Sequence, residues 1–467
     1  MIAKQLLADA NELCRLGVAE LAAGFASAKF TPLEVAQATL ARAEAVQKRF
    51  NAFSLIDADS ALAMASESTA RWRSGAPLSA VDGVPTTIKD IVWVKDRAVR
   101  YGSRTTSSAP CAQDAPSVKR LRAAGAVFVG QTTTPEFGWK ALTDSPLTGV
   151  TRNPWNPEMT PGGSSGGAVV AAATGAGVLH IGTDGGGSIR IPCSFTGMVG
   201  LKPTFGRVAA YPPSVFGTLA HIGPIARSAE DAAAMLDVLA GRDIDDWNQG
   251  IGALPALALT ADVLKGARIG FYTEPAFGVV DAEVAAAVAK ALGTLESLGA
   301  RVEPVALPGE DLAETFRIHW YAAAANRFAA VPADLQSLCD PGFVEVARAG
   351  AAFAASALVA AQLRRTAFGA AMDKLLTKLD FIVSPATVFT AFAVGREDGG
   401  NVAVERSIKA GGFAFPFNLS QQPALSLPCG LTAAGLPIGL QFVGPRGADG
   451  KVLSAARDFA RATGDGV

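Results

Sequence analysis

The sequence predicts an α/β fold: a single large domain with a mixed, mainly wound central β-sheet that α-helices cover on both faces. Short apolar, β-branched segments typical of buried strands alternate along the chain with longer helical segments. Much of the apolar content is Ala, which fits helices packed tightly on a sheet, and 467 residues can bury a large core. This alternation along the whole chain favours a wound sheet with helices on both sides.

The first half of the chain contains the clearest helix signal. Thr31-Pro32-Leu33-Glu34 is a capping box with proline at the first helical position, and it predicts a helix that continues to about Phe50. The other elements predicted in this half are an N-terminal helix over 1–13, helices over 57–73, 117–125, 168–177 and 228–239, and strands over 85–92, 126–130 and 178–182.

A loop-like segment over 243–260 is the expected seam between the two halves of the chain. Beyond it, the same patterns predict strands over 267–271, 301–306, 381–385, 424–428 and 437–443, and helices over 281–298, 311–328, 341–376 and 451–461.

Composition excludes several classes of function. The net charge is −1 and the pI is near 6.4, so nothing points to a nucleic-acid partner or an anionic membrane. No apolar run approaches the roughly 18 residues of a membrane span. The five cysteines are scattered without a CxxC pair, and the three histidines form no HExxH motif. We therefore expect a reduced, cytoplasmic protein without a catalytic metal.

Two glycine-rich serine turns dominate residues 159–192. The first reads GGSSGG over 162–167, and the second reads DGGGSIR over 184–190. Such turns are either flexible loops or places where backbone N–H groups surround a nucleophile. Ser188 is the stronger nucleophile candidate because three glycines precede it. The N–H groups expected to form a nest for an oxyanion are those of Gly185, Gly186, Gly187 and Ser188.

A serine nucleophile requires a base, and the histidines are poor candidates. His180 is interpreted as a core histidine, His221 and His319 have unremarkable contexts, and no GxSxG motif is present. Lys89 lies in an apolar strand, where a lysine needs a partner or a lowered pKa. The alternative for Lys89 is an edge-strand lysine that prevents aggregation. Either Ser164 or Ser165 could relay a proton between Ser188 and Lys89, since a hydroxyl both donates and accepts.

The lysine of TTIKD, the GGSSGG turn and the DGGGSIR turn together resemble the amidase signature family of hydrolases in order and spacing. The segments NPWNPEMTPGGSSGG, HIGPIARSAEDAA and FNLSQQPALSLPCGLTAAGLPIGLQFVG are similar to family features as well. The resemblance runs from about Leu33 to the C-terminus, and it is loose between 243 and 400.

The resemblance implies that Ser188 is the acylated nucleophile, Lys89 the general base, and Ser164 a bridging serine that follows a cis peptide bond. It implies an oxyanion nest after Asp184 and no metal or organic cofactor. The residues expected to support this site are Ser165, Thr183, Asp184 and Arg190. Among them, Asp184 and Arg190 are expected to form a structural ion pair.

The expected layout is one amidase signature domain over 1–467. It has a core with the catalytic motifs at about 70–240, a variable substrate-side helical region at about 245–400, and a C-terminal return to the sheet at about 410–467. The predicted pocket walls are Trp139 and the segments 211–216, 316–320 and 413–417, which hint at an apolar substrate arm.

We expect hydrolysis of a small carboxamide, a small-molecule substrate, to a carboxylate and ammonia or an amine. The alternatives are a glutaminase-type A subunit of a tRNA-dependent amidotransferase, a biuret- or allophanate-type hydrolase, and a catalytically dead binding protein. The Ala-rich segment 317–365 lacks the tyrosine-rich, basic character expected of the glutaminase-type protein. A homodimer is left open.

Overall fold

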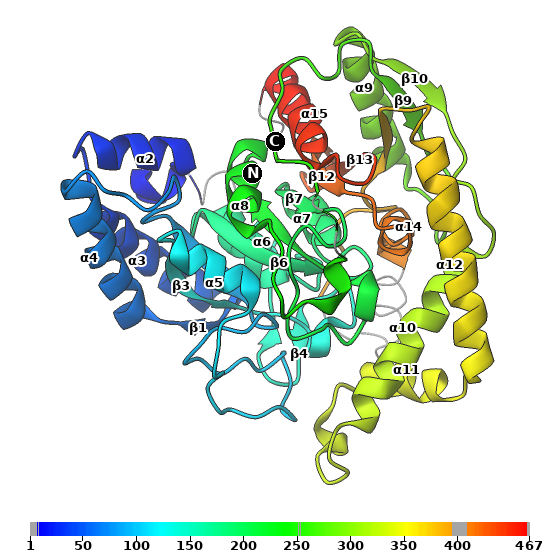
Figure 1. Ribbon diagram of the computed structural model, residues 1–467, viewed down its shortest axis with the longest axis horizontal. Coiled ribbons are helices and arrows are strands. Elements are labelled where there is room, and N and C mark those ends of the chain that lie inside the picture. Colours follow the sequence, from blue (N-terminus) through cyan, green and yellow to red (C-terminus); the bar gives the residue numbers. More distant parts are fainter. Residues whose placement is uncertain (1–6, 8, 251, 253, 395–408, 465–467) are drawn as a thin grey trace.

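The computed structural model describes residues 7, 9–250, 252, 254–394 and 409–464 (Figure 1). The helix expected over 1–13 lies largely outside the described residues; within them, a short 3₁₀ helix spans Glu12–Arg15.

One mixed sheet of 11 strands forms the centre of the described chain. In spatial order its strands are β1 (Phe53–Ile56), β3 (Val127–Thr132), β2 (Pro85–Lys89), β6 (Leu179–Asp184), β8 (His221–Ala226), β7 (Val199–Lys202), β12 (Ala424–Leu431), β13 (Pro437–Val443), β11 (Phe381–Pro385), β9 (Arg268–Phe271) and β10 (Arg301–Pro304). The groups β3-β2-β6 and β11-β9-β10 are parallel, and antiparallel pairs join them. The predicted fold class is confirmed. A separate small pair consists of β4 (Asp144–Ser145) and β5 (Gly149–Val150).

Helices flank this sheet. They are α2 (Val18–Ala26), α3 (Pro32–Phe50), α4 (Ala58–Arg73), α5 (Pro116–Ala123), α6 (Gly166–Thr174), α7 (Arg190–Thr196), α8 (Ala229–Leu239), α9 (Ala282–Ser297), α10 (Leu312–Ala329), α11 (Pro341–Ala351), α12 (Ala355–Leu375), α14 (Pro416–Leu419) and α15 (Asp449–Thr463). Short 3₁₀ helices span Glu136–Gly138, Gly217–Leu219, Trp247–Gln249 and Gln336–Leu338. Figure 1 shows α2, α3 and α4 at one end of the molecule and α10, α11 and α12 at the other.

The capping box predicted for α3 is present. Glu34 N donates to Thr31 Oγ1 at 3.2 Å, and Thr31 N donates to the Glu34 carboxylate at 2.7 Å. These two bonds satisfy backbone donors that the start of a helix leaves without partners.

The strand that carries Lys89 is shorter than predicted. It ends at Lys89 instead of continuing to residue 92, because Ile91 N and Val92 N both donate to Lys89 O and so turn the chain. Lys89 therefore lies at the carboxyl end of β2, between β3 and β6 in the sheet. This central position excludes the edge-strand explanation for the lysine.

The helix predicted over 341–376 is two helices. Residues 352–354 separate α11 from α12, and the pair is bent by 96°. Gly350 allows α11 to lie against α10, since a Cβ there would sit 1.9 Å from Tyr321 O. No single helix among the described residues is long and apolar enough to cross a membrane; α11 and α12 meet that criterion only when taken together across their bend.

The hydrophobic clusters include a large one formed by the sheet strands with α2, α5, α8, α9 and α15, and an aromatic-rich one next to α10, α11 and α12. The second cluster includes Phe137, Trp139, Phe216, Trp320 and Phe415. Trp320 of this cluster packs on Gly185 of the second glycine-rich turn, and Gly138, next to Phe137, lies beside Ser164 of the first. The cluster therefore borders the site described below.

Two helical glycines give opposite expectations for the same substitution. Gly350→Ala would force α11 away from α10, and we expect it to lower the free energy of unfolding by roughly 1–3 kcal/mol. Gly369 of α12 has no atom within 4 Å of an added Cβ, so Gly369→Ala should raise that free energy by about 0.5–1 kcal/mol. Chemical denaturation measures both changes. Equal stability of the two variants would contradict the close packing of α10 on α11.

Candidate active site

The site lies at the carboxyl ends of two neighbouring parallel strands. β2 ends at Lys89, and β6 leads into the turn that carries Ser188. The register pairs Ile88 with Ile181, which places the end of β2 beside the end of β6. The sheet thus brings a lysine and a serine turn that are far apart in sequence to one edge, where α/β sheets place their ligands.

Lys89 is fully buried among hydroxyl groups. Its Nζ lies 2.7 Å from Ser164 Oγ, 3.0 Å from Ser165 Oγ and 2.8 Å from Thr183 Oγ1. Within the described chain, no carboxylate reaches ion-pair distance of this amine. Burial lowers the pKa of Lys89 well below its ordinary 10.5, and the more distant charge of Asp184 only partly opposes that shift. The neutral amine is therefore favoured.

The two candidate relay serines have different surroundings. Ser165 is fully buried; its hydroxyl donates to Thr183 O at 3.2 Å and accepts from Thr183 N at 3.3 Å. Ser164 lines the same cavity as Ser188, and its hydroxyl bonds to Lys89. The Gly163–Ser164 peptide bond is cis, as the family resemblance implied. Of the two hydroxyls, that of Ser164 connects Lys89 with the cavity.

Ser188 follows the glycine turn, and the structure gives its hydroxyl no hydrogen-bond partner among the described residues. Within that same part of the chain, the N–H groups of Gly185, Gly186 and Ser188 also have no acceptor. The N–H of Gly187 differs from expectation, because it donates to Asp184 Oδ1 at 2.8 Å and is not free for an oxyanion. Three of the four expected donors thus remain open.

Aromatic side chains explain why the first two positions of this turn are glycine. A Cβ on Gly185 would lie 3.0 Å from the Trp320 ring, and a Cβ on Gly186 would lie 2.7 Å from the Phe316 ring. Gly187 has a φ of +125°, which L side chains rarely adopt. The turn is therefore held against α10 at a spacing that only glycine permits.

Asp184 and Arg190 form the expected ion pair. Arg190 Nε and Nη2 donate to the two carboxylate oxygens at 2.9 Å each, and both side chains are fully buried. Asp184 also accepts from Asn418 Nδ2 at 2.9 Å. The guanidinium and these hydrogen bonds hold the pKa of Asp184 well below its usual range against the effect of burial.

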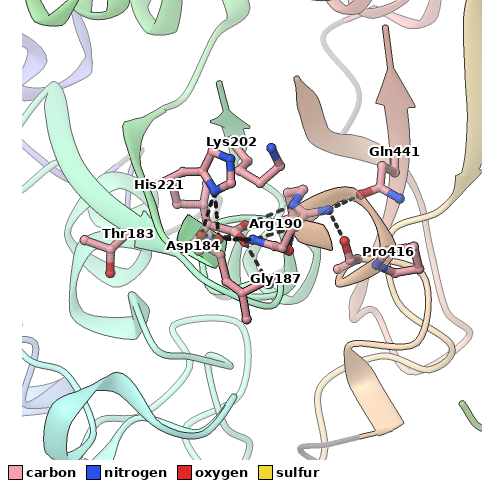
Figure 2. A network of polar contacts seen from close by, with 12 residues as sticks. Thr183, Asp184, Gly187, Arg190, Lys202, His221, Pro416 and Gln441 are labelled. Atoms are coloured by element: carbon pink, nitrogen blue, oxygen red, sulfur yellow. Dashed lines mark hydrogen bonds and ion pairs between the residues drawn. The ribbon is translucent and has the colours of Figure 1, made fainter. Parts of the chain in front are cut away.

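Arg190 also connects the turn that carries Ser188 to the C-terminal segment. Its Nη1 donates to Gln441 Oε1 and to Ala414 O at 2.7 Å each. Figure 2 shows Arg190 between Asp184 on one side and Gln441 on the other. Because Asp184 accepts from Gly187 N, this network fixes the backbone immediately before Ser188. Gln441 and Asn418 had no signal in the sequence that linked them to the turn.

The structure brings none of the three histidines into a hydrogen bond with Ser188. His180 Nδ1 lies 2.8 Å from Thr87 Oγ1, and burial lowers its pKa to about 3. His221 Nδ1 donates to Leu219 O at 2.9 Å, and its Nε2 is buried without a partner. His319 on α10 contacts Thr315 O through Nδ1. His180 is thus a core histidine, as predicted.

Two cavities meet at Ser188. The larger, about 310 Å³, is lined by Ser164, Ser188 and the segment 211–216. The smaller, about 220 Å³, is lined by Ser188, Trp139, Phe316 and Phe415. Trp320 lines both and stacks on Phe216 at 3.6 Å between ring centroids. Most of the predicted pocket walls line these cavities: Trp139, the segment 211–216, Phe316, Arg317, Trp320 and Phe415. The rest of 413–417 does not, because Phe413 and Phe417 are buried in the aromatic-rich cluster. Sequence reasoning missed Tyr101, Phe137 and Arg327, which also line the larger cavity.

Within the described residues, no group of three or more His, Cys, Asp and Glu side chains could hold a metal ion. The five cysteines are free thiols. The metal-free reaction stays a prediction.

Known proteins resemble the chain along nearly all of its length. The model of the Amidase family matches residues 34–453. The chain is 36% identical to the A subunit of glutamyl-tRNA(Gln) amidotransferase from Anaeromyxobacter sp. (strain K), over 97% of this chain and 98% of that relative. A bacterial aryl acylamidase of the amidase signature enzymes superimposes with a TM-score of 0.86 and 26% identity, covering 96% of each chain. A 6-aminohexanoate cyclic dimer hydrolase superimposes with a TM-score of 0.84 and 27% identity, covering 97% of this chain and 98% of that one.

The buried ion pair generates a prediction for stability. Arg190→Met would leave the Asp184 carboxylate buried without its cation, and we expect the free energy of unfolding at pH 7 to fall by about 3–5 kcal/mol. The control is Arg461→Met, which breaks the exposed pair of Arg461 with Glu230 and should change stability by at most about 1 kcal/mol. Urea denaturation measures both. A loss for Arg190→Met no larger than that of the control would show that the pair is not needed to hold the turn.

Proposed function

The chain belongs to the amidase signature family of hydrolases, and from that premise we propose that it cleaves the C–N bond of a small carboxamide through an acyl-enzyme on Ser188. The observation that carries the proposal is the hydrogen bond between Ser164 Oγ and Lys89 Nζ at 2.7 Å, at the edge of the cavity that Ser188 also lines. A buried amine whose neutral form burial favours, bonded to a hydroxyl in the cavity that Ser188 lines, can supply the base that such a nucleophile requires.

In the first step, Ser188 Oγ attacks the carbonyl carbon of the amide. Its proton passes to Ser164 Oγ, while the proton of Ser164 passes to the lone pair of Lys89 Nζ. The N–H groups of Gly185, Gly186 and Ser188 stabilise the negative charge that develops on the carbonyl oxygen. Ser188 must turn toward Ser164 for this transfer, and such contacts commonly tighten only when substrate is bound.

In the second step, the proton returns from Lys89 through Ser164 to the leaving nitrogen, and ammonia or an amine departs. Water then attacks the acyl group on Ser188 with the same relay acting as base. Asp184 and Arg190 take no proton in this scheme. They hold the turn, so they are positioning residues.

The aromatic walls on both sides of Ser188 support a substrate with an apolar arm. Trp320 and Phe316 on α10 line the cavities at Ser188. The structural relatives include an aryl acylamidase and a 6-aminohexanoate cyclic dimer hydrolase. A small aryl or alkyl carboxamide therefore suits the site best.

A second candidate rests on the relatives that are named as the A subunit of glutamyl-tRNA(Gln) amidotransferase, with 33–36% identity to this chain. In that role the amide would be glutamine, and the chain would work with partner proteins. Ammonia release from aryl amides, alkyl amides and L-glutamine by the chain alone distinguishes the two candidates, because a protein that depends on partners would release little from any of them. The alanine-rich character of α10, α11 and α12 favours the stand-alone enzyme.

A series of serine substitutions tests the proposed roles. Ser188→Ala removes the nucleophile, and we expect kcat to fall by roughly 10⁴-fold or more. Ser164→Ala breaks the relay and should lower kcat by roughly 10²–10⁴-fold. Ser165→Ala should lower kcat less, because the Ser165 hydroxyl is bonded to the Thr183 backbone and does not carry the proton. Amide hydrolysis and thermal unfolding are measured for each variant. Wild-type turnover by folded Ser188→Ala would contradict the mechanism, and a larger loss for Ser165→Ala than for Ser164→Ala would reverse the two roles.

A further inference from the structure

Arg327 is a cation in the wall of the larger cavity, which Ser164 and Ser188 also line. Its side chain is half-buried. Within the described residues, no carboxylate reaches ion-pair distance of its guanidinium, and none of its N–H groups has a hydrogen-bond acceptor. A guanidinium offers five donors, so the cavity contains a set of charged donors that the protein itself does not use.

The other arginine in the walls of these cavities is already paired with a carboxylate. Arg317 lines the smaller cavity, and its Nε and Nη2 each donate to the Glu314 carboxylate at 2.7 Å. Its charge is thus matched by a carboxylate on the same helix. The carboxylate of Glu136, which acts on Arg327 only at a distance, accepts instead from Ser103 Oγ at 2.6 Å and from Asp340 N.

Arg327 lies on the face of α10 that covers the catalytic turn. It follows Trp320 by seven residues, two helical turns or about 10 Å along the axis, and Trp320 packs on Gly185. Helical side chains lean toward the N-terminus of their helix, and the Arg327 side chain lines the same cavity as Ser188. The guanidinium carbon lies 4.3 Å from the centroid of the Phe137 ring. The next residue, Gly138, is adjacent to Ser164 Oγ.

Stacking on Phe137 alone does not account for this arginine. A guanidinium over a ring uses its face, and the N–H groups in its plane stay free to bind a carboxylate through two parallel bonds. Those in-plane donors are the ones without acceptors here. The ring contact therefore holds the guanidinium at the cavity wall and leaves its donors for a ligand.

Tyr101 supplies a second donor in the same cavity. Its hydroxyl accepts from Trp93 Nε1 at 2.9 Å, so its own proton remains to be donated. Tyr101 and Phe137 both have positive φ, +55° and +53°, and Phe137 N donates to Tyr101 O at 2.7 Å. Such backbone is uncommon for aromatic residues and concentrates at ligand sites. The chain thus holds both aromatic residues in place beside Arg327.

We propose that Arg327 and Tyr101 bind a carboxylate group of the substrate, so that the amides preferred by Ser188 carry a carboxylate at the end of one arm. This inference rests on the proposed amidase function and narrows its substrate class. Arg327 is a specificity-determining residue in this scheme, and it takes no part in proton transfer. The carboxylate belongs either to the acyl arm or to the amine arm.

Two matched pairs of aryl amides test the proposal. The acyl-side pair is 4-carboxybenzamide and 4-acetylbenzamide, followed by ammonia release. The amine-side pair is 4-acetamidobenzoate and 4-acetamidoacetophenone, followed by arylamine release. Within each pair, a methyl ketone replaces the carboxylate at nearly the same size. We expect the wild-type chain to favour the carboxylate member of one pair by roughly 10- to 100-fold in kcat/KM.

Variants assign that preference to the two residues. Arg327→Met should remove the preference, mainly by raising KM for the carboxylate member of the pair. It should leave kcat/KM for the neutral member unchanged. Arg327→Lys keeps the charge without the planar fork and should retain part of the preference. Tyr101→Phe should lower it by roughly 3- to 10-fold. Arg317→Met is the matched control, because its charge is already paired; the ratio within each pair should change by less than about twofold.

The results distinguish a failure of the carboxylate site from a failure of the amidase function. Two results would overturn the carboxylate site and leave the amidase function standing. One is an equal kcat/KM for the two members of both pairs in the wild-type chain. The other is an equal loss of kcat/KM for both members of a pair in Arg327→Met. A drop in the ratio for Arg317→Met as large as for Arg327→Met would overturn the carboxylate site as well. Failure of the wild-type chain to hydrolyse any of the four amides, and benzamide and L-glutamine besides, would overturn the proposed function together with the inference that rests on it.

Discussion

A lysine buried at the carboxyl end of a central strand, with hydroxyls around it and, among the described residues, no carboxylate at ion-pair distance, is the constraint on which the site depends. A buried charge is costly unless it is paired, so the fold favours the neutral amine. Ser164, Ser165 and Thr183 supply hydrogen bonds that either protonation state of Lys89 can use. The proposed base is therefore a lysine and not a histidine. Ser164 and Thr183, which both bond to it, line the cavity that Ser188 also lines.

The charge of Asp184, which acts to raise the pKa of Lys89, is itself paired. Asp184 ends the strand next to Lys89, and an unpaired carboxylate there would keep the lysine protonated. Arg190 binds both oxygens of Asp184, which neutralises that charge and orients the turn before Ser188. The same arginine reaches Gln441 on β13. One buried pair therefore matches the charge of Asp184, fixes the backbone before Ser188 and joins the C-terminal strands to the site.

Much of this arrangement could be predicted from residues that are close in sequence. Periodicity and capping identified α3 and β6, and the two glycine turns identified Ser164 and Ser188. The rest depends on contacts across the fold. The end of β2 at Lys89 follows from a turn that no local pattern marks. The contacts of Ser165 with the Thr183 backbone support the choice of Ser164 that the family resemblance implied. The loss of Gly187 as a donor and the unpaired state of Arg327 likewise depend on partners far along the chain.

The central claim is that Lys89 is neutral when it acts, and the pH dependence of kcat/KM for amide hydrolysis tests it most directly. Since only the neutral amine accepts a proton, activity should rise with pH through one ionisation well below the ordinary 10.5 of lysine and then stay level. The folded Lys89→Met variant should lose that ionisation together with most of its activity. A rise only near pH 10, or an unchanged profile in Lys89→Met, would contradict the assignment of Lys89 as the base.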